Sequence, residues 1–211
     1  MTPPLTIAVP RGALFGDTLD LLERLGVDTA EIRSNDRKLF FREAGVITVR
    51  PSDVPTYVES GAADVGITGK DVLLEQADRH VYELLDLGFG GCRMIVATRE
   101  GDDPLGEPLR RRGLVRVATK YPRIARDWFA STGRQAEIVE VKGSVELAPL
   151  TGLADAIVDL TATGRTLVEN GLVEREPIVE STARLIANPV AHKLKAAAID
   201  EMVDRLRGLS P

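Results

Sequence analysis

The chain has 211 residues, of which 44% are hydrophobic and 28% are charged, values that are ordinary for a globular protein. Its formal net charge of -5 argues against a general binder of nucleic-acid backbones, because such proteins normally carry a basic surplus. The single cysteine, Cys92, excludes an intramolecular disulfide, and its apolar neighbours favour a buried, inert thiol.

Short apolar runs alternate with amphipathic segments along the whole chain, which is the pattern of an α/β protein. The apolar runs predict strands at Leu5–Val9, Val46–Arg50, Ala63–Ile67, Arg93–Thr98, Val115–Ala118, Ile138–Val141 and Ala156–Leu160. The amphipathic segments predict helices from Phe15 to about Gly26, at Pro55–Gly61, at Pro122–Ser131 and at Gly164–Asn170.

The last predicted helix has Asn188 as its N-cap and Pro189 as its first residue. It places a core-facing stripe at spacings of three and four, formed by Ile199, Met202, Val203 and Leu206.

A soft division of the chain falls at Leu87–Gly91, where the three glycines form either a hinge or a twisted strand end. If the chain then crosses back to its first half near Glu180–Ala183, it forms two lobes with a cleft between them. The predicted lobes are residues 1–88 with 181–211, and residues 89–180.

No stretch approaches the roughly 18 consecutive apolar residues of a membrane span. The first residues also lack the basic and apolar regions of a signal peptide. The two histidines, His80 and His192, lie far apart without neighbouring cysteines, so neither a zinc site nor a histidine-based triad is supported. The sequence therefore predicts a cytoplasmic protein with no membrane or nucleic-acid partner.

The segment from Glu146 to Leu167 carries the most chemical information. Its buried strand ends at Asp159 and runs into a turn that opens a helix, Thr161-Ala162-Thr163-Gly164-Arg165-Thr166. Backbone N–H groups converge at such a turn, the threonine hydroxyls add donors, and Gly164 lets the backbone approach a ligand closely. This pattern predicts a phosphate-binding loop without the lysine of a Walker motif.

Asp159 follows the buried strand at the position where a carboxylate can accept hydrogen bonds from ribose hydroxyls. The alternative for the same segment is purely structural. In that case Thr163 only caps the helix and Asp159 only stabilises a turn.

The spacing of this segment is specific. Glu146, Gly152, Asp159, Thr163-Gly164 and Thr166-Leu167 together match the signature of ATP phosphoribosyltransferases, so the chain resembles that family. Other segments follow the family's pattern as well, namely Ile7–Leu14, Val49-Arg50, Asp53, Gly61, Asp64–Ile67 and Gly69–Asp71. Two positions depart from it: Arg11 replaces the usual lysine, and Ala13 stands where arginine is common.

The resemblance implies a two-lobed fold like a type II periplasmic binding protein, with the active site in the cleft between the lobes. It implies transfer of the phosphoribosyl group of 5-phosphoribosyl 1-diphosphate to N1 of ATP, which releases diphosphate and begins histidine biosynthesis. Mg²⁺ is expected on the substrate phosphates rather than in a metal site built by the protein. The chain looks like the short form of the family, which works in a hetero-oligomer with a regulatory subunit resembling histidyl-tRNA synthetase.

The expected site residues fall into two groups. Asp159 and Arg50 are assigned to catalysis. Substrate binding is assigned to Asp159, Thr161, Ala162, Thr163, Gly164, Arg165, Thr166, Glu146, Arg11, Gly12, Gly69 and Lys70. A surface ion pair is the alternative for Arg50, and an ordinary capped helix start is the alternative for Gly69 and Lys70.

Two other basic clusters are expected to be structural. Arg33, Arg37 and Lys38 form a solvated face, and Arg110–Arg112 sit at a helix C-terminus where cations suit the dipole. Two other functions remain open at this point, a non-catalytic binding module with the same fold and a phosphoribosyltransferase acting on a nucleobase.

Overall fold

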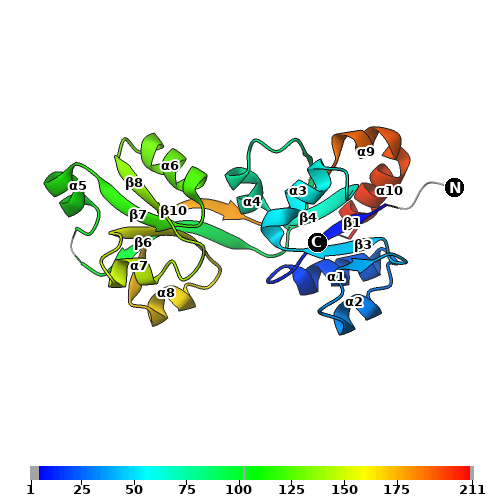
Figure 1. Ribbon diagram of the computed structural model, residues 1–211, viewed down its shortest axis with the longest axis horizontal. Helices are drawn as coiled ribbons and strands as arrows, with labels where there is room; N and C mark the ends of the chain where they lie inside the picture. The colour runs from blue at the N-terminus through cyan, green and yellow to red at the C-terminus, as the bar shows by residue number, and fades with distance from the viewer. Residues whose placement is uncertain (1–4, 102, 210–211) are drawn as a thin grey trace. The chain divides into compact units, whose positions relative to one another are not determined.

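The structure, a computed structural model, describes residues 5–101 and 103–209 (Figure 1). Contacts between residues divide the chain into two compact units. Unit 1 runs up to Gly91 and resumes at Thr182, and unit 2 comprises Cys92–Ser181. Each unit contains one mixed sheet with helices against it, which confirms the predicted α/β class. Among the described residues, no helix is long and apolar enough to cross a membrane.

Unit 1 is built on a sheet with strand order β2-β3-β1-β4-β11-β5. Strands β1, β3 and β4 are parallel, whereas β2 and β11 run antiparallel to their neighbours. The strands are β1 Ile7–Pro10, β2 Phe40–Phe41, β3 Val46–Val49, β4 Val65–Gly69, β5 Tyr82–Asp86 and β11 Ala183–Ala187. The helices are α1 Phe15–Arg24, α2 Ala30–Ser34, α3 Val54–Glu59, α4 Lys70–Glu75, α9 Pro189–Leu194 and α10 Ala196–Arg207, with a 3-10 turn at Pro51–Asp53.

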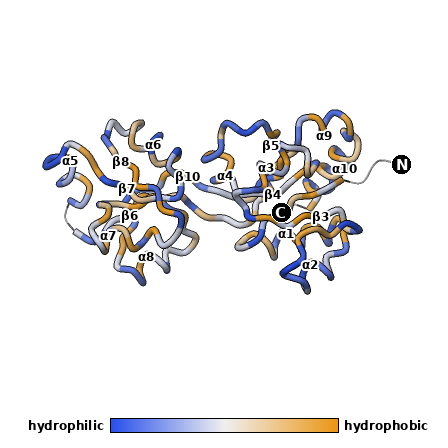
Figure 2. Tube along the Cα trace, viewed as in Figure 1, coloured by the Kyte–Doolittle hydropathy of each residue, from blue (hydrophilic) through white to orange (hydrophobic). Residues whose placement is uncertain are grey.

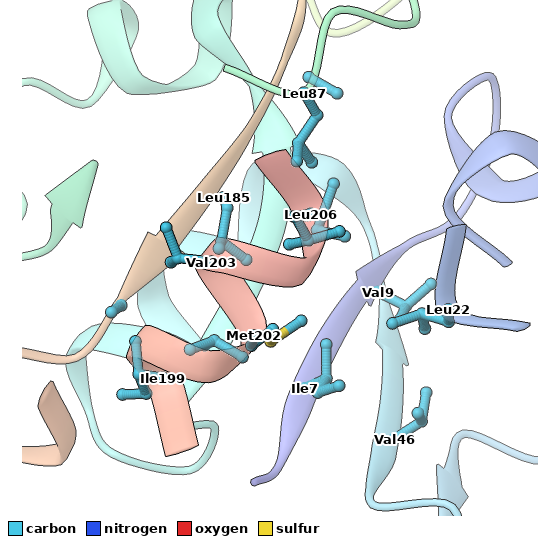
Figure 3. Close-up of a cluster of buried hydrophobic side chains, with 14 of the residues drawn as sticks. Ile7, Val9, Leu22, Val46, Leu87, Leu185, Ile199, Met202, Val203 and Leu206 are labelled. Atoms are coloured by element: carbon cyan, nitrogen blue, oxygen red, sulfur yellow. The ribbon is translucent and has the colours of Figure 1, made fainter. Parts of the chain in front are cut away.

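The two faces of the unit 1 sheet are covered by different helices. Alternate residues of β1 point to opposite faces, so Ile7 and Val9 pack with α1 and α10, whereas Ala8 packs with α3. The stripe predicted for the last helix is buried on the first of these faces (Figure 3). Each side chain of that size contributes roughly 1.5–3 kcal/mol when it is fully buried.

Unit 2 is built on a sheet with strand order β10-β6-β9-β7-β8. Strands β8, β7 and β9 are parallel, and β6 is antiparallel to both β9 and β10. The strands are β6 Cys92–Arg99, β7 Val115–Thr119, β8 Ala136–Glu140, β9 Ala156–Thr161 and β10 Leu172–Ser181. The helices are α5 Gly106–Arg112, α6 Pro122–Ser131, α7 Leu147–Leu150 and α8 Arg165–Glu169.

Within unit 2, α7 and α8 lie over one face of the sheet and α6 lies over the other (Figure 1). The α7–α8 face buries Ile95, Ala118 and Ile157 against Ala148 and Leu167. Hydrophobic stretches follow strands such as β3, while the short surface helix α2 is largely hydrophilic (Figure 2). The predicted alternation of apolar strands and amphipathic helices is therefore present within each unit.

The predicted end of the first helix at Gly26 is confirmed, and glycines end two further helices in the same way. Gly26 and Gly133 follow α1 and α6 with φ of +89° and +71°, and Gly113 caps α5 with φ of +74°. These left-handed conformations are the ones that favour glycine at a helix C-terminus. The single predicted C-terminal helix, however, is two helices that meet at Lys195, whose φ of -121° and ψ of 27° interrupt the helix.

Candidate functional site

A pocket of about 190 Å³ opens where β9 ends and α8 begins. Its walls come from the end of β9, the following turn, the first residues of α8 and the residue that precedes α7. The lining residues are Glu146, Asp159, Leu160, Thr161, Ala162, Thr163, Arg165, Thr166 and Leu167. The structure therefore gathers in one pocket most of the signature residues, namely Glu146, Asp159, Thr163, Thr166 and Leu167.

The turn holds itself in shape through its own hydroxyls. Thr161 Oγ1 accepts a hydrogen bond from Gly164 N at 2.9 Å, and Thr163 Oγ1 accepts one from Arg165 N at 3.4 Å. Because a hydroxyl can accept and donate at once, both threonines keep an O–H that can be given to a ligand. Gly164 has φ of +76°, a conformation that side-chain-bearing residues adopt only with strain.

The carboxylate of Asp159 points into this pocket from a buried position, with 8% of the residue exposed. Asp159 shares its face of the sheet with Ile157, because side chains on a strand alternate between faces. Its Oδ1 accepts a hydrogen bond from the N–H of Leu160 at 2.8 Å. Burial raises the pKa of this carboxyl above its ordinary value, and the neighbouring carboxylate of Glu146 also raises it.

Lys120 is a site residue that the sequence analysis missed. Its Nζ lies 3.2 Å from Asp159 Oδ1, and this ammonium opposes the rise in the pKa of Asp159. Parallel β7 and β9 pair Thr119 with Val158, so the next residues, Lys120 and Asp159, come side by side. The sequence shows that Lys120 directly follows an apolar strand. It does not show that this strand pairs with the strand of Asp159, because strand order depends on contacts between distant segments.

Arg165 lines the pocket, yet its Nε is engaged with Glu169 Oε1 at 2.8 Å, one turn along α8. The Arg165 side chain is 83% exposed, so this ion pair is of the weak surface kind.

The remaining predicted residues lie in unit 1, at the carboxyl ends of its parallel strands. Arg11 and Gly12 follow β1, Arg50 follows β3, and Lys70 follows Gly69 at the end of β4. In-register pairing of β1 with β3 and β4 brings these strand ends to one edge of the sheet. Ligands of open α/β sheets bind at this kind of edge.

Two of these cations already have partners within unit 1. Arg11 donates to Thr48 Oγ1 at 3.1 Å and to the carbonyls of Asp36 and Lys38 at 2.5 and 3.1 Å. Lys70 Nζ lies 2.6 Å from Glu83 Oε2. Arg50 is exposed, and within the described residues its guanidinium makes no side-chain hydrogen bond or ion pair.

The basic clusters predicted to be structural have acidic neighbours. Arg33 pairs with Asp20 and Glu23 at 2.5 and 2.9 Å, and Lys38 pairs with Glu31 at 2.5 Å. In the second cluster, Arg110 pairs with Asp103 at 2.6 Å and Arg112 pairs with Asp155. Cys92 is half-buried at the start of β6, so it is more accessible than its apolar surroundings in sequence predict.

A larger pocket of about 390 Å³ lies at the opposite ends of β7 and β9. Its charged lining includes Asp103 and Asp155, which are engaged with Arg110 and with Arg112 and Arg116, respectively. Gly152 of the signature lines this larger pocket, but none of the residues predicted to act in catalysis or substrate binding does. The smaller pocket at Asp159, which is lined by several of those residues, is therefore the stronger candidate site.

No group of three or more His, Cys, Asp or Glu suited to a metal ion occurs within residues 5–101 and 103–209. The acids that line the candidate pocket are Asp159 and Glu146. Two carboxylates are too few for a metal site built by the protein, which agrees with a divalent cation that takes its oxygen ligands from substrate phosphates and water.

Comparison with known proteins gives a consistent picture. The family model described as HisG, ATP phosphoribosyltransferase, matches residues 50–208. An ATP phosphoribosyltransferase of Rubrobacter xylanophilus is 55% identical over 198 residues, covering 92% of this chain and 91% of the relative. One from Desulfitobacterium hafniense is 48% identical, with 97% and 96% of the two chains covered.

Solved structures agree with these relatives. A chain of the ATP phosphoribosyl transferase (HisG:HisZ) complex from Thermotoga maritima has a TM-score of 0.77 and 32% identity, over 97% of this chain and 98% of that chain. The periplasmic aliphatic sulphonate binding protein SsuA from Escherichia coli has a TM-score of 0.61 at 14% identity, over 97% of this chain and 72% of that one. The second likeness concerns the fold alone, and it confirms the predicted resemblance to type II periplasmic binding proteins.

Proposed function

The chain belongs to the ATP phosphoribosyltransferase family, and from that premise we propose how its residues serve the reaction. The enzyme transfers the phosphoribosyl group of 5-phosphoribosyl 1-diphosphate to N1 of ATP, releasing diphosphate, in the first step of histidine biosynthesis. The observation that carries the proposal is the single pocket formed by Glu146, Asp159 and the turn at 161–166.

In this proposal the turn from Thr161 to Thr166 binds the 5-phosphate of the phosphoribosyl substrate. The hydroxyls of Thr161 and Thr163 can donate to phosphate oxygens while their oxygens continue to hold the turn. Gly164 has no side chain, and no protein atom lies within 4 Å of the position that a Cβ would occupy. This open space lets a phosphate approach the backbone. Arg165 and Thr166 contribute from the first turn of α8, and Ala162 lines the same wall.

Asp159 and Glu146 are assigned to the ribose. The ribose is bonded to its 5-phosphate in the substrate, and Asp159 lies two residues before the phosphate turn in the chain. An ionised carboxylate accepts hydrogen bonds from hydroxyls, and charge-assisted bonds of this kind are the stronger ones. A nearby anion also favours the positive charge that develops at the ribose C1 as diphosphate departs.

The edge residues of unit 1 are proposed to meet the polyphosphate groups of the substrates. Arg50 is the strongest candidate for stabilising the departing diphosphate, because its exposed guanidinium is not engaged in an ion pair within the described residues. Gly12 is exposed after β1, whereas Gly69 is buried at the end of β4, where it pairs with Ala183. Lys70 would have to leave its ion pair with Glu83 in order to bind a phosphate. Arg11 acts chiefly by holding the loop that contains Asp36 and Lys38, through hydrogen bonds to their carbonyls.

No strong general base is required, since N1 of adenine already carries the lone pair that attacks C1. The protein's task is to hold two polyanions in line and to stabilise the charge that leaves as diphosphate. Mg²⁺ bound to the substrate phosphates would neutralise part of that charge without a metal site built by the protein.

We further propose that the chain works with a partner subunit in a hetero-oligomer. The solved structure from Thermotoga maritima is titled as a HisG:HisZ complex, and its matched chain is covered almost completely by this one. A subunit resembling histidyl-tRNA synthetase is the partner that the sequence resemblance implies. A cytoplasmic location, also predicted from the sequence, accords with biosynthetic relatives.

The test is an assay of the purified chain with ATP, 5-phosphoribosyl 1-diphosphate and Mg²⁺, run with and without the partner. The expected products are diphosphate and an adduct whose mass equals that of ATP plus a phosphoribosyl group. An adduct formed with free nucleobases in place of ATP would indicate the nucleobase-specific alternative. Binding of both substrates without diphosphate release, in the presence of the partner, would indicate a non-catalytic module.

A further inference from the structure

Lys120 occupies a position that the assigned reaction does not yet explain. It follows β7 directly, and Ala118, two residues earlier, packs on the α7–α8 face of the sheet. Because strand residues two apart point to the same face, Lys120 extends from β7 toward the side that carries Asp159. The observed separation of 3.2 Å between Lys120 Nζ and Asp159 Oδ1 agrees with this register.

The pair is asymmetric in its exposure. The Asp159 side chain is 11% exposed, whereas that of Lys120 is 41% exposed. A buried carboxylate loses hydration, and this loss disfavours its charged form. Lys120 is solvated enough to keep its own charge at little cost and close enough to stabilise the charge on Asp159.

The other charged groups around Asp159 do not take this role. Glu146, at the start of α7, carries the same sign as Asp159 and raises its pKa. On the β6 side, Arg93 is paired with Glu174 at 2.6 Å, and on the α8 side Arg165 is paired with Glu169. Within the described residues, Lys120 is the cation that forms an ion pair with Asp159.

We propose that Lys120 is a positioning residue for the phosphoribosyl transfer, whose ammonium fixes the Asp159 carboxylate in the pocket as an anion that faces the ribose. The inference rests on the proposed role of Asp159. It adds that this role depends on a residue from a different strand, outside the signature segment 146–167.

The consequence for pH follows from the direction of each effect. Burial raises the pKa of Asp159, and Lys120 lowers it. Removing the ammonium while leaving burial and Glu146 in place raises the pKa further. Asp159 is then protonated over a wider range of pH, a protonated carboxyl accepts hydrogen bonds poorly, and turnover is lost from the acid side first.

The experiment compares Lys120→Met with Lys120→Arg in the full chain, measured with its partner subunit across the pH range in which the wild type is stable. For Lys120→Met we expect the acid limb of the kcat profile to move up by about one pH unit. On the acid side of the wild-type limb this corresponds to about a tenfold loss of kcat, which recovers at alkaline pH. The KM for the phosphoribosyl substrate should change less than about threefold, and Lys120→Arg should keep the wild-type limb.

Lys142→Met is the matched control, because Lys142 also pairs with a carboxylate, Glu140, but is 87% exposed and lines no part of the pocket. Its pH profile should be that of the wild type. Asp159→Asn, measured in parallel, tests the role of Asp159 separately from that of Lys120. Full activity of Asp159→Asn would overturn the proposed role of Asp159 itself.

Two results would overturn the inference about Lys120 alone, given an inactive Asp159→Asn. One is an unchanged acid limb in Lys120→Met. The other is a rise of tenfold or more in KM at every pH with no movement of the limb, because it would mean that Lys120 binds a substrate phosphate directly.

Discussion

Burial and the neighbouring Glu146 raise the pKa of Asp159, whereas Lys120 lowers it. Replacing Asp159 with asparagine removes the charge but keeps the shape and the oxygen that accepts the Leu160 N–H. We expect Asp159→Asn to lower kcat by about two to three orders of magnitude, or roughly 2.7–4 kcal/mol, the scale of one electrostatic contact in an active site. The KM for the phosphoribosyl substrate should change by much less.

Stability, measured on the same preparation, separates this role from a purely structural one. Because the folded state raises the pKa of Asp159, ionising this group near neutral pH costs folding free energy. Its neutral replacement should therefore leave the Tm within about 3 °C of the wild type, or raise it. A lower Tm with normal turnover per folded molecule would instead mean that Asp159 only stabilises the turn.

Gly164 provides a second prediction at the scale of one residue. Gly164→Val adds a branched side chain where the phosphate is proposed to lie, so binding of 5-phosphoribosyl 1-diphosphate should weaken about tenfold or more, or by at least about 1.4 kcal/mol. The variant should still fold, although valine at φ of +76° is strained. Isothermal titration calorimetry with the folded variant measures the change.

Gly133→Val is the control for backbone strain. Gly133 has a similar φ of +71° and an equally open Cβ direction, but it lies after α6 and lines no part of the pocket. It should lose stability in the same way and keep its affinity. Equal affinities of both variants and the wild type would remove the turn from the site.

The start of helix α9 could be predicted from the sequence, because the N-cap residue that marks it is local to the helix. Asn188 accepts hydrogen bonds from Val190 N and Ala191 N at 2.9 and 2.8 Å, as its position before Pro189 indicates. The same side chain also donates to the carbonyls of Val58 and Glu59 at 2.8 and 3.1 Å, which ties α9 to the end of α3. That second role depends on a contact across some 130 residues and could not be predicted.

Asn188→Ala should therefore cost more than a lost helix cap. A cap contributes about 1 kcal/mol, and removing the donor of the Glu59 carbonyl adds about 1–3 kcal/mol, whereas the Val58 carbonyl keeps the N–H of Gly61 at 3.0 Å. We expect the free energy of unfolding to fall by roughly 2–4 kcal/mol in denaturant titrations, with normal turnover per folded molecule. Asn35→Ala is the control, since Asn35 makes only local hydrogen bonds in an exposed turn, and it should cost less than about 1 kcal/mol. Equal losses in both variants would show that the link to α3 contributes nothing.

The elements that sequence reasoning missed share one cause. The break between α9 and α10 at Lys195 carries no glycine or proline signal, and Lys195 instead reaches Asp64 at 2.7 Å from another part of unit 1. Strand β11 is short and apolar, and it gains its place only by pairing with β4 and β5. Likewise, Lys120 lies beside Asp159 only because β7 pairs with β9. Local composition does not encode these partners.

At the scale of the whole molecule, the chain leaves unit 1 after Gly91 and returns at Thr182 to place β11 inside the first sheet. Unit 1 therefore cannot complete its sheet until unit 2 has been traversed. The α/β class followed from periodicity, whereas the likeness to periplasmic binding proteins followed only from the resemblance to a family. Spacing over residues 146–167 was specific enough to locate the pocket because strand, turn and helix there are consecutive in sequence.

The last prediction concerns regulation. We expect control by histidine to reside in the proposed partner subunit, so the isolated chain should show no saturable response to histidine in a thermal-shift titration. A ligand at 100 times its Kd stabilises the folded state by about 2.7 kcal/mol, which for a chain of this size raises the Tm by about 5–10 °C. The assay is therefore sensitive enough to detect a histidine site, and 5-phosphoribosyl 1-diphosphate, which should raise the Tm, serves as the positive control. Adding the partner should make turnover sensitive to histidine, and the Gly164→Val variant should show a smaller rise in Tm with the phosphoribosyl substrate. A saturable rise in Tm with histidine in the isolated chain would place the regulatory site in this chain and contradict the proposal.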